Sequence, residues 1–97
     1  MDSVELKEDM FITNPLGMHV RPAARLVETV LPFESEVYIY IDGRRVNAKS
    51  TIGLMSLAAV QGTRFTVSCK GPDAQAAMDA VRDIVGRGFD DDEDLVP

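Results

Sequence analysis

Cysteine and histidine each occur once in the 97 residues, as Cys69 and His19, and tryptophan is absent. One cysteine cannot form an intramolecular disulfide, and one cysteine with one histidine cannot supply the usual ligands of a structural zinc site. We therefore expect no metal site and no bound cofactor. Cys69 alternates with polar neighbours in a predicted strand, so we expect a half-buried residue that packs as a small apolar side chain.

The chain also has no long apolar run and no charged-then-apolar leader, which favours a cytoplasmic protein without membrane insertion. Basic residues are in the minority, because 10 Lys and Arg stand against 16 Asp and Glu, for a net charge of −6. The acidic run at residues 90–94 carries five of these charges, so the remainder is nearly neutral. Sequence-independent nucleic-acid binding requires a basic face. We therefore expect no nucleic-acid partner.

The chain does contain enough apolar sequence for one small domain, since 45% of its residues are hydrophobic. We expect a single domain over residues 1–89 and a disordered acidic tail over residues 90–97. Apolar residues repeat with period two in four predicted strands and with period 3.6 in three predicted helices. In chain order these are a strand at 4–13, a helix at 19–30, strands at 36–41 and 44–49, a helix at 50–60, a strand at 64–69 and a helix from Pro72 or Asp73 to about residue 85.

This order, β-α-β-β-α-β-α, predicts an α+β fold in two layers, with one four-stranded antiparallel sheet and three helices on one face. The second helix is apolar on nearly every side, and so small a domain cannot bury every side. We expect one stripe to face the core and another to reach the surface for a partner. The inward stripe comprises Leu54, Leu57 and Ala58, and the outer stripe comprises Ile52, Met55 and Ala59.

His19 stands where a loop becomes a helix, after Gly17, which permits close approach of the backbone. A helix N-terminus presents unpaired N–H groups and the positive end of the helix dipole, so it binds anions. We expect the backbone N–H groups of Val20 and Arg21, with the Arg21 guanidinium, to bind a phosphate here. The same field favours a neutral imidazole, the form that attacks phosphorus. The plainer alternative is that His19 is a helix cap or a surface residue.

Ser50 precedes the second predicted helix, where serine is a favoured N-cap. Such a serine can also be phosphorylated, because a phosphate is stabilised by the helix N-terminus. The modification would add about −2 of charge beside Ile52 and Met55 and so block an apolar docking face. Capping alone is the plainer interpretation.

Two segments together resemble the bacterial histidine-containing phosphocarrier family, HPr, of the sugar phosphotransferase system. They are Gly17-Met18-His19-Val20-Arg21-Pro22-Ala23 and Asn47-Ala48-Lys49-Ser50-Thr51-Ile52-Gly53-Leu54-Met55-Ser56-Leu57. The resemblance covers about residues 5–88, and both the separation of the segments and the order of elements agree with it. It implies an open-faced β-sandwich and a stoichiometric phosphoryl carrier rather than an enzyme.

The resemblance also implies a role for each matching residue. His19 is the residue that enzyme I phosphorylates on Nδ1, at the expense of phosphoenolpyruvate, before the phosphoryl group passes to an enzyme IIA. Arg21 stabilises the transferring group, and Ser50 is the regulatory site of HPr kinase/phosphorylase. The face that docks enzyme I and enzyme IIA comprises Val20, Ile52 and Met55.

Leu16 departs from the family pattern, because several members carry a small polar residue there that helps hold the histidine ring. An apolar side chain cannot do this, and a backbone group is the expected substitute. One alternative function is a regulatory module of carbon or nitrogen control, which signals to a partner such as a transcriptional regulator through its phosphorylation state. A small-molecule enzyme is disfavoured by the single imidazole and by the lack of an evident large pocket. We expect a monomer.

Overall fold

The computed structural model describes residues 4–91. Its strands are β1 (Val4–Phe11), β2 (Glu36–Ile41), β3 (Arg44–Asn47) and β4 (Arg64–Gly71), and its helices are α1 (Val20–Val30), α2 (Thr51–Met55) and α3 (Ala74–Gly86). A short 3-10 turn, η1 (Gly88–Asp90), follows α3. The predicted α+β class, the order of elements and the four-stranded antiparallel sheet with three helices are confirmed.

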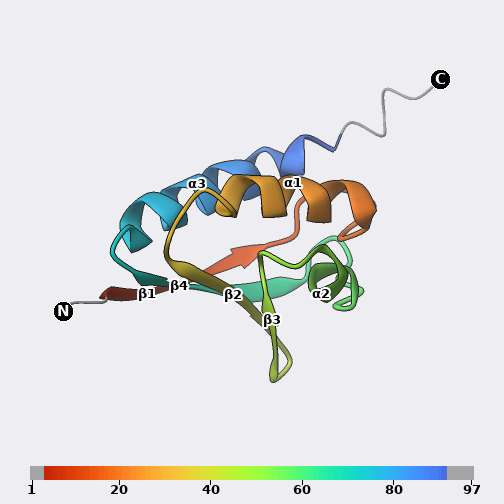
Figure 1. Cartoon of the computed structure of the whole chain (residues 1–97). Helices are drawn as coiled ribbons and strands as arrows, with labels where there is room; N and C mark the ends of the chain where they lie inside the picture. Colours follow the sequence, from red (N-terminus) through yellow and green to blue (C-terminus); the bar gives the residue numbers. More distant parts are fainter. Residues whose placement is uncertain (1–3, 92–97) are drawn as a thin grey trace.

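The strands form one sheet in the order β1-β4-β2-β3, and every neighbouring pair is antiparallel. Asp42 and Gly43 join β2 to β3 with φ values of 50° and 79°, as a tight hairpin turn requires. Helices α1 and α3 lie side by side over one face of the sheet, and α2 lies beside the start of α1 (Figure 1). No helix of the described residues covers the opposite face, so the sandwich is open on that side.

The core fills the space between sheet and helices, because the inward residues of each strand are apolar. Phe65, Val67 and Cys69 alternate inward along β4, and they share one buried cluster with Leu26 of α1 and Val81 of α3. Cys69 is fully buried rather than half-buried, and burial raises the pKa of its thiol to about 11. Its thiolate is therefore disfavoured, and Cys69 is a packing residue.

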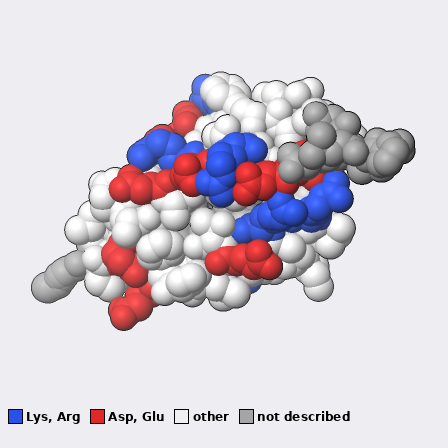
Figure 2. Space-filling model, turned by 90° about the horizontal axis from the view of Figure 1, so that it is seen from above, with Lys and Arg blue, Asp and Glu red and all other residues white. Residues whose placement is uncertain are grey.

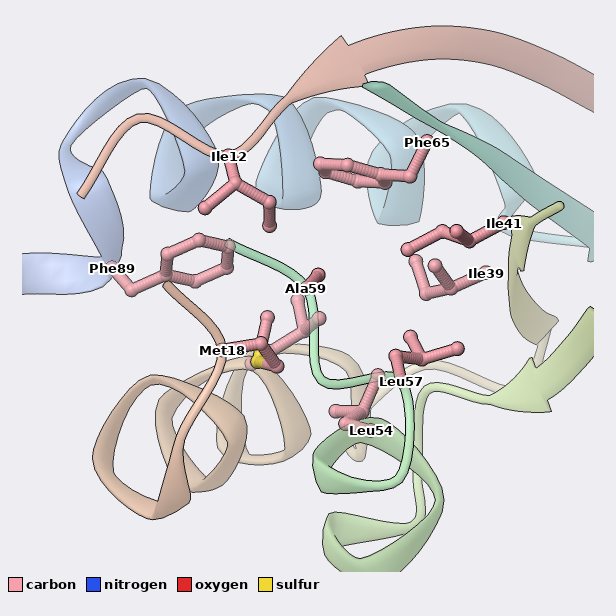
Figure 3. Close-up of a pocket in the computed structure, with 10 residues that line it drawn as sticks. Ile12, Met18, Ile39, Ile41, Leu54, Leu57, Ala59, Phe65 and Phe89 are labelled. Atoms are coloured by element: carbon pink, nitrogen blue, oxygen red, sulfur yellow. The ribbon is translucent and has the colours of Figure 1, made fainter. Parts of the chain in front are cut away.

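A small cavity lies within this core (Figure 3). Its volume is about 10 Å³, about enough for one water molecule. The side chains around it, which include Met18 from the loop before α1 and Phe89 from η1, are all apolar. The cavity is therefore a packing feature of the core and not a site for a polar substrate.

Helix α2 is about half as long as predicted, and the difference has a tertiary cause. The helix ends at Met55, and Ala58 adopts a left-handed φ of 51°. This reversal allows the carbonyl oxygen of Ala59 to accept a hydrogen bond of 2.8 Å from the N–H of Met18 in the loop before α1. The two predicted stripes change accordingly, because Leu54 is buried as expected, but Ala58 is exposed and Ala59 is buried.

Two strands also end earlier than predicted. β1 ends at Phe11 rather than at residue 13, and β3 ends at Asn47 rather than at residue 49. The side-chain oxygen of Asn47 accepts the backbone N–H of Lys49 at 2.8 Å, which forms an Asx turn. This local turn ends β3 two residues before the alternating pattern does.

Acidic and basic side chains are interleaved over the helical layer (Figure 2). Arg82 of α3 illustrates this, because it pairs with Asp79 on the same helix and with Glu8 of β1. Its guanidinium holds the pKa of both carboxyl groups below their ordinary values. Such exposed pairs each contribute little to stability. No helix within residues 4–91 is long and apolar enough to cross a membrane.

Candidate functional site

His19 is the N-cap residue of α1, with an extended backbone (φ −125°, ψ −165°). Its carbonyl oxygen accepts the first helical hydrogen bond, from the N–H of Ala23 at 3.0 Å. Its side chain makes no capping hydrogen bond, and 32% of that side chain is exposed. His19 therefore has the position of a cap, as the plainer alternative predicts, but its ring is left for other contacts.

The loop before α1 is fixed by contacts with the segment after α2. Gly17 has a φ of 71°, and a Cβ placed on it would lie 2.3 Å from the carbonyl oxygen of Ala59. Met18 donates its backbone N–H to that same oxygen. Asn14, which is buried, donates from Nδ2 to the carbonyl oxygen of Gly17 at 2.8 Å. The close backbone approach at Gly17 is thus made to the chain itself, and it fixes where α1 begins.

A buried carboxylate lies beside the imidazole. Asp91 Oδ2 is 2.7 Å from His19 Nε2, and Asp91 Oδ1 is 2.5 Å from Arg21 Nε. Asn14 Nδ2 donates to Oδ2 at 3.1 Å. The Asp91 side chain is completely buried, so hydrogen-bond donors and the positive charge of Arg21 replace its lost hydration. Arg21 therefore contacts a carboxylate of the chain itself, whereas its contact with a phosphate stays a prediction.

The prediction of a disordered tail from residue 90 is wrong for Asp90 and Asp91. Phe89 is fully buried in the core and holds η1 against α1. Arg25 of α1 donates to the carbonyl oxygens of Phe89 and Asp90. The remainder of the predicted tail, residues 92–97, lies outside the described residues. The acidic run conceals Asp91 in the sequence, and the apolar Phe89 just before it is the signal that could have revealed a docked segment.

The Asp91 carboxylate contacts one of the two ring nitrogens of His19, which is Nε2. An ionised carboxylate only accepts hydrogen bonds, and this one lies against the Arg21 guanidinium, so the 2.7 Å contact places a proton on Nε2. In a neutral ring, Nδ1 then carries the lone pair, and it forms no hydrogen bond within residues 4–91. Leu16 is exposed and cannot hold the ring. The expected substitute, a backbone group, is replaced by the Asp91 side chain.

Ser50 is the N-cap of α2, as predicted, because its Oγ accepts the N–H of Gly53 at 3.0 Å. Helix α2 contacts α1 near the start of that helix, so Ser50 and His19 precede neighbouring helices (Figure 1). The residues expected to dock partners are all exposed large apolar side chains, and they are Val20, Ile52 and Met55.

The site places an imidazole beside positive charge. The imidazole of His19 lies at the N-terminus of α1, and the guanidinium of Arg21 binds the same carboxylate as the ring. A nitrogen nucleophile beside a guanidinium and a helix N-terminus suits the transfer of a phosphoryl group. Within residues 4–91, no three His, Cys, Asp or Glu side chains form a group that could hold a metal ion.

Known proteins share this arrangement of sequence and fold. Residues 6–87 match the family model described as the PTS HPr component phosphorylation site. The chain belongs to the HPr family. It is 41% identical over 87 residues to the phosphocarrier protein HPr of Xylella fastidiosa (strain 9a5c), and the match covers 90% of this chain and 98% of that protein. It is 39% identical over 88 residues to the phosphocarrier protein NPr of Escherichia coli (strain K12), with the same two shares covered.

The fold agrees with the HPr family as well. A crystal structure of HPr from Thermoanaerobacter tengcongensis matches with a TM-score of 0.85 at 36% identity, and the match covers 90% of this chain and 98% of that chain. The predicted resemblance is therefore confirmed, and the chain is a phosphocarrier of the HPr and NPr kind. The family match includes His19, Arg21 and Ser50, and it ends four residues before Asp91.

Proposed function

We propose that His19 accepts a phosphoryl group on Nδ1 from phospho-enzyme I and passes it to an enzyme IIA, as a stoichiometric carrier in the cytoplasm. The observation that carries the proposal is the 2.7 Å hydrogen bond between His19 Nε2 and Asp91, which leaves the lone pair on Nδ1. Membership of the HPr family supports the same role. The proposal requires no cofactor.

The proposed step is an in-line displacement at phosphorus. The Nδ1 lone pair forms the new N–P bond while the P–N bond of the phosphorylated donor breaks, and that electron pair returns to the donor nitrogen. Because such transition states are loose, catalysis depends mainly on positioning and on stabilising charge on the phosphoryl oxygens. The Arg21 guanidinium and the backbone N–H groups of Val20 and Arg21 supply that positive charge.

Labelling tests the proposal directly. Incubation with phosphoenolpyruvate and enzyme I is expected to give one phosphoryl group per chain, in an adduct that is labile in acid and stable in base. His19→Ala is expected to remain unlabelled, because the chain contains no other histidine. Equal labelling of His19→Ala and the parent would disprove a carrier role for this residue.

The proposed docking face for enzyme I and enzyme IIA consists of Val20, Ile52 and Met55. Ile52 is 81% exposed, and burial of such an apolar side chain under a partner favours binding. Ile52→Asp is expected to lower kcat/KM for phosphorylation by enzyme I about tenfold, mainly by raising KM for the carrier. Val4→Asp is the matched control, because Val4 is also exposed but lies at the far end of β1. Equal effects of the two changes would rule out this face.

Ser50 is the proposed site of regulatory phosphorylation by HPr kinase/phosphorylase. A phosphate on Ser50 would place about −2 of charge next to the docking residues Ile52 and Met55. Ser50→Asp imitates part of this charge, whereas Ser50→Asn keeps a neutral capping side chain. We expect slower labelling of His19 by enzyme I in Ser50→Asp than in Ser50→Asn. Equal rates would argue against inhibition by charge.

A regulatory carrier of carbon or nitrogen control is the alternative. It is supported by the identity of 39% to the NPr protein, which is close to the 41% identity to HPr. The two functions use the same residues and differ in the enzymes that exchange phosphoryl groups with His19. Labelling rates with the donor enzymes of a sugar branch and of a nitrogen branch distinguish them, because the physiological donor is expected to give the higher kcat/KM.

A further inference from the structure

We propose that Asp91 is a positioning residue for phosphoryl transfer, which fixes the tautomer and orientation of the His19 ring and holds Arg21 beside it. This inference rests on the proposed function of His19. Asp91 lies beyond residues 6–87, the part of the chain that matches the HPr family model. The chain therefore supplies a component of the site from outside the family match.

Each oxygen of the Asp91 carboxylate contacts a different side chain of the site. Oδ2 binds the ring, through His19 Nε2 at 2.7 Å, and Oδ1 binds Arg21 Nε at 2.5 Å. Asn14 Nδ2 donates to Oδ2 as well, at 3.1 Å, and Asn14 is itself buried. A completely buried carboxylate held from both oxygens has a defined position. The ring and the guanidinium are then positioned relative to each other.

The position of the proton decides what the ring can do. A neutral imidazole in water exchanges its proton between both nitrogens, and only the nitrogen without the proton attacks phosphorus. Because Asp91 accepts a hydrogen bond from Nε2–H, the Nδ1 atom of the neutral ring stays unprotonated. When Nδ1 binds phosphorus, Nε2 keeps its proton and the ring gains positive charge. The adjacent carboxylate stabilises that charge, as a buried aspartate does for the histidine of a catalytic triad.

The backbone that delivers Asp91 is unusual. Gly88, Phe89 and Asp90 have φ values of 63°, 59° and 52°, so three consecutive residues adopt left-handed conformations. For Phe89 this conformation is unfavourable, and it persists because the side chain is buried and because Arg25 binds the following carbonyl oxygens. Beyond this turn, Asp91 extends back toward Gly88, whose carbonyl oxygen accepts its N–H at 3.1 Å. The turn aims the carboxylate at the start of α1.

The first test is the tautomer of His19 in the full chain, read from ¹⁵N chemical shifts of the ring at about pH 9, where histidine is neutral. The parent is expected to carry its proton on Nε2. Asp90→Asn is the matched control, because it removes the same charge from an adjacent, partly exposed side chain and tolerates a left-handed backbone. Asp90→Asn is expected to match the parent. In Asp91→Ala the ¹⁵N shifts of Nδ1 and Nε2 are expected to converge, because the proton exchanges between these two nitrogens.

The second test is the rate of phosphoryl transfer from phospho-enzyme I. Asp91→Ala is expected to lower kcat about 10- to 100-fold, a range typical of residues that orient a reactive ligand, and Asp90→Asn is expected to change it less than about twofold. If Asp91→Ala does not fold, the ring spectrum of Asp91→Asn is compared with that of the parent instead. A proton on Nδ1 in the parent, or unchanged shifts in both Asp91 variants, would overturn the proposal. If the shifts change as expected but the parent is not labelled at His19, the proposed function fails while the positioning by Asp91 stands.

Discussion

At the scale of one residue, Gly17 allows the loop before α1 to pack against the backbone of Ala59. A methyl group at this position would meet the backbone of Ala59 in addition to the strain of a φ of 71°. Gly17→Ala is therefore expected to destabilise the fold by about 2–4 kcal/mol in urea unfolding. Gly43→Ala is the control, because its φ is 79° but no atom lies within 4 Å of the added methyl group. Its expected cost is about 1–2 kcal/mol, from strain alone. Equal losses would show that the contact with Ala59 is not tight.

The residues of the site differ in how far the sequence could predict them. His19 and Arg21 follow a glycine and precede a proline, so their place at a helix start could be predicted from local signals. The contact between Asn14 and Asp91 could not be predicted in this way, because the two residues lie 77 positions apart along the chain. Composition also misleads at Asp91, since a run of acidic residues is typical of a solvated tail. The packing of Phe89 and the hydrogen bonds from Arg25 bring this carboxylate to the ring.

At the scale of elements, Asp73 joins the start of α3 to the start of β2. Its carboxylate accepts the hydroxyl of Ser35 at 2.5 Å and the backbone N–H groups of Glu34 and Ser35 at 2.9 Å each. The Ser35 hydroxyl first, and then the Glu34 N–H, hold the pKa of Asp73 below its ordinary value. Asp73 is also the N-cap residue of α3, but its side chain is used for this joint and not for capping.

The lowered pKa of Asp73 predicts a pH-dependent contribution to stability. A carboxyl group whose pKa is lower in the folded than in the unfolded chain stabilises the fold fully above about pH 4, and this contribution is lost as the pH falls through the folded pKa. Asp73→Asn is therefore expected to lower the urea midpoint at pH 7, and the difference from the parent is expected to shrink below about pH 4. Glu34→Gln, an exposed neighbour, is the control. A pH-independent difference would contradict the role of the charge.

Helix α2 shows why the limits of an element are harder to predict than its existence. The apolar pattern of residues 51–60 is consistent with a continuous helix, and Ser50 is the cap that the sequence predicts. The helix stops at Met55 because the following residues turn to bring Ala59 against the loop of Gly17. That contact involves backbone atoms, which leave no pattern in the sequence. Its one signal is Gly17 itself, and a glycine does not identify its partner.

At the scale of the whole molecule, Phe89 connects the core to the site. Its side chain is fully buried and lines the cavity beside Met18 and Ile12 (Figure 3). Phe89→Ala is expected to reduce the free energy of unfolding by about 3–5 kcal/mol. Phe11→Ala is the matched control, because Phe11 is 54% exposed, and its effect is expected to stay below about 1 kcal/mol. Denaturant unfolding of both variants measures the difference, and similar losses would contradict the role of Phe89 as an anchor.

The architecture as a whole could be predicted because each strand and helix has a clear period and because turn residues such as Asp42 and Gly43 separate them. The order of strands in the sheet, with β4 between β1 and β2, is not visible in any local pattern. It depends on long-range pairing, in which Met10 lies opposite Phe65 and Val67 lies opposite Ile39. The same long-range packing brings the end of the described chain to the start of α1.

The position of the phosphoryl group on the His19 ring shows whether Nδ1 is the nitrogen that carries it. The full chain would be phosphorylated with phosphoenolpyruvate and enzyme I, and the ring would be examined by ¹⁵N and ³¹P correlation NMR. The phosphoryl group is expected on Nδ1, with a proton on Nε2 next to Asp91, because the 2.7 Å contact occupies that nitrogen. A phosphoryl group on Nε2, or on any residue other than His19, would contradict the proposed transfer to Nδ1.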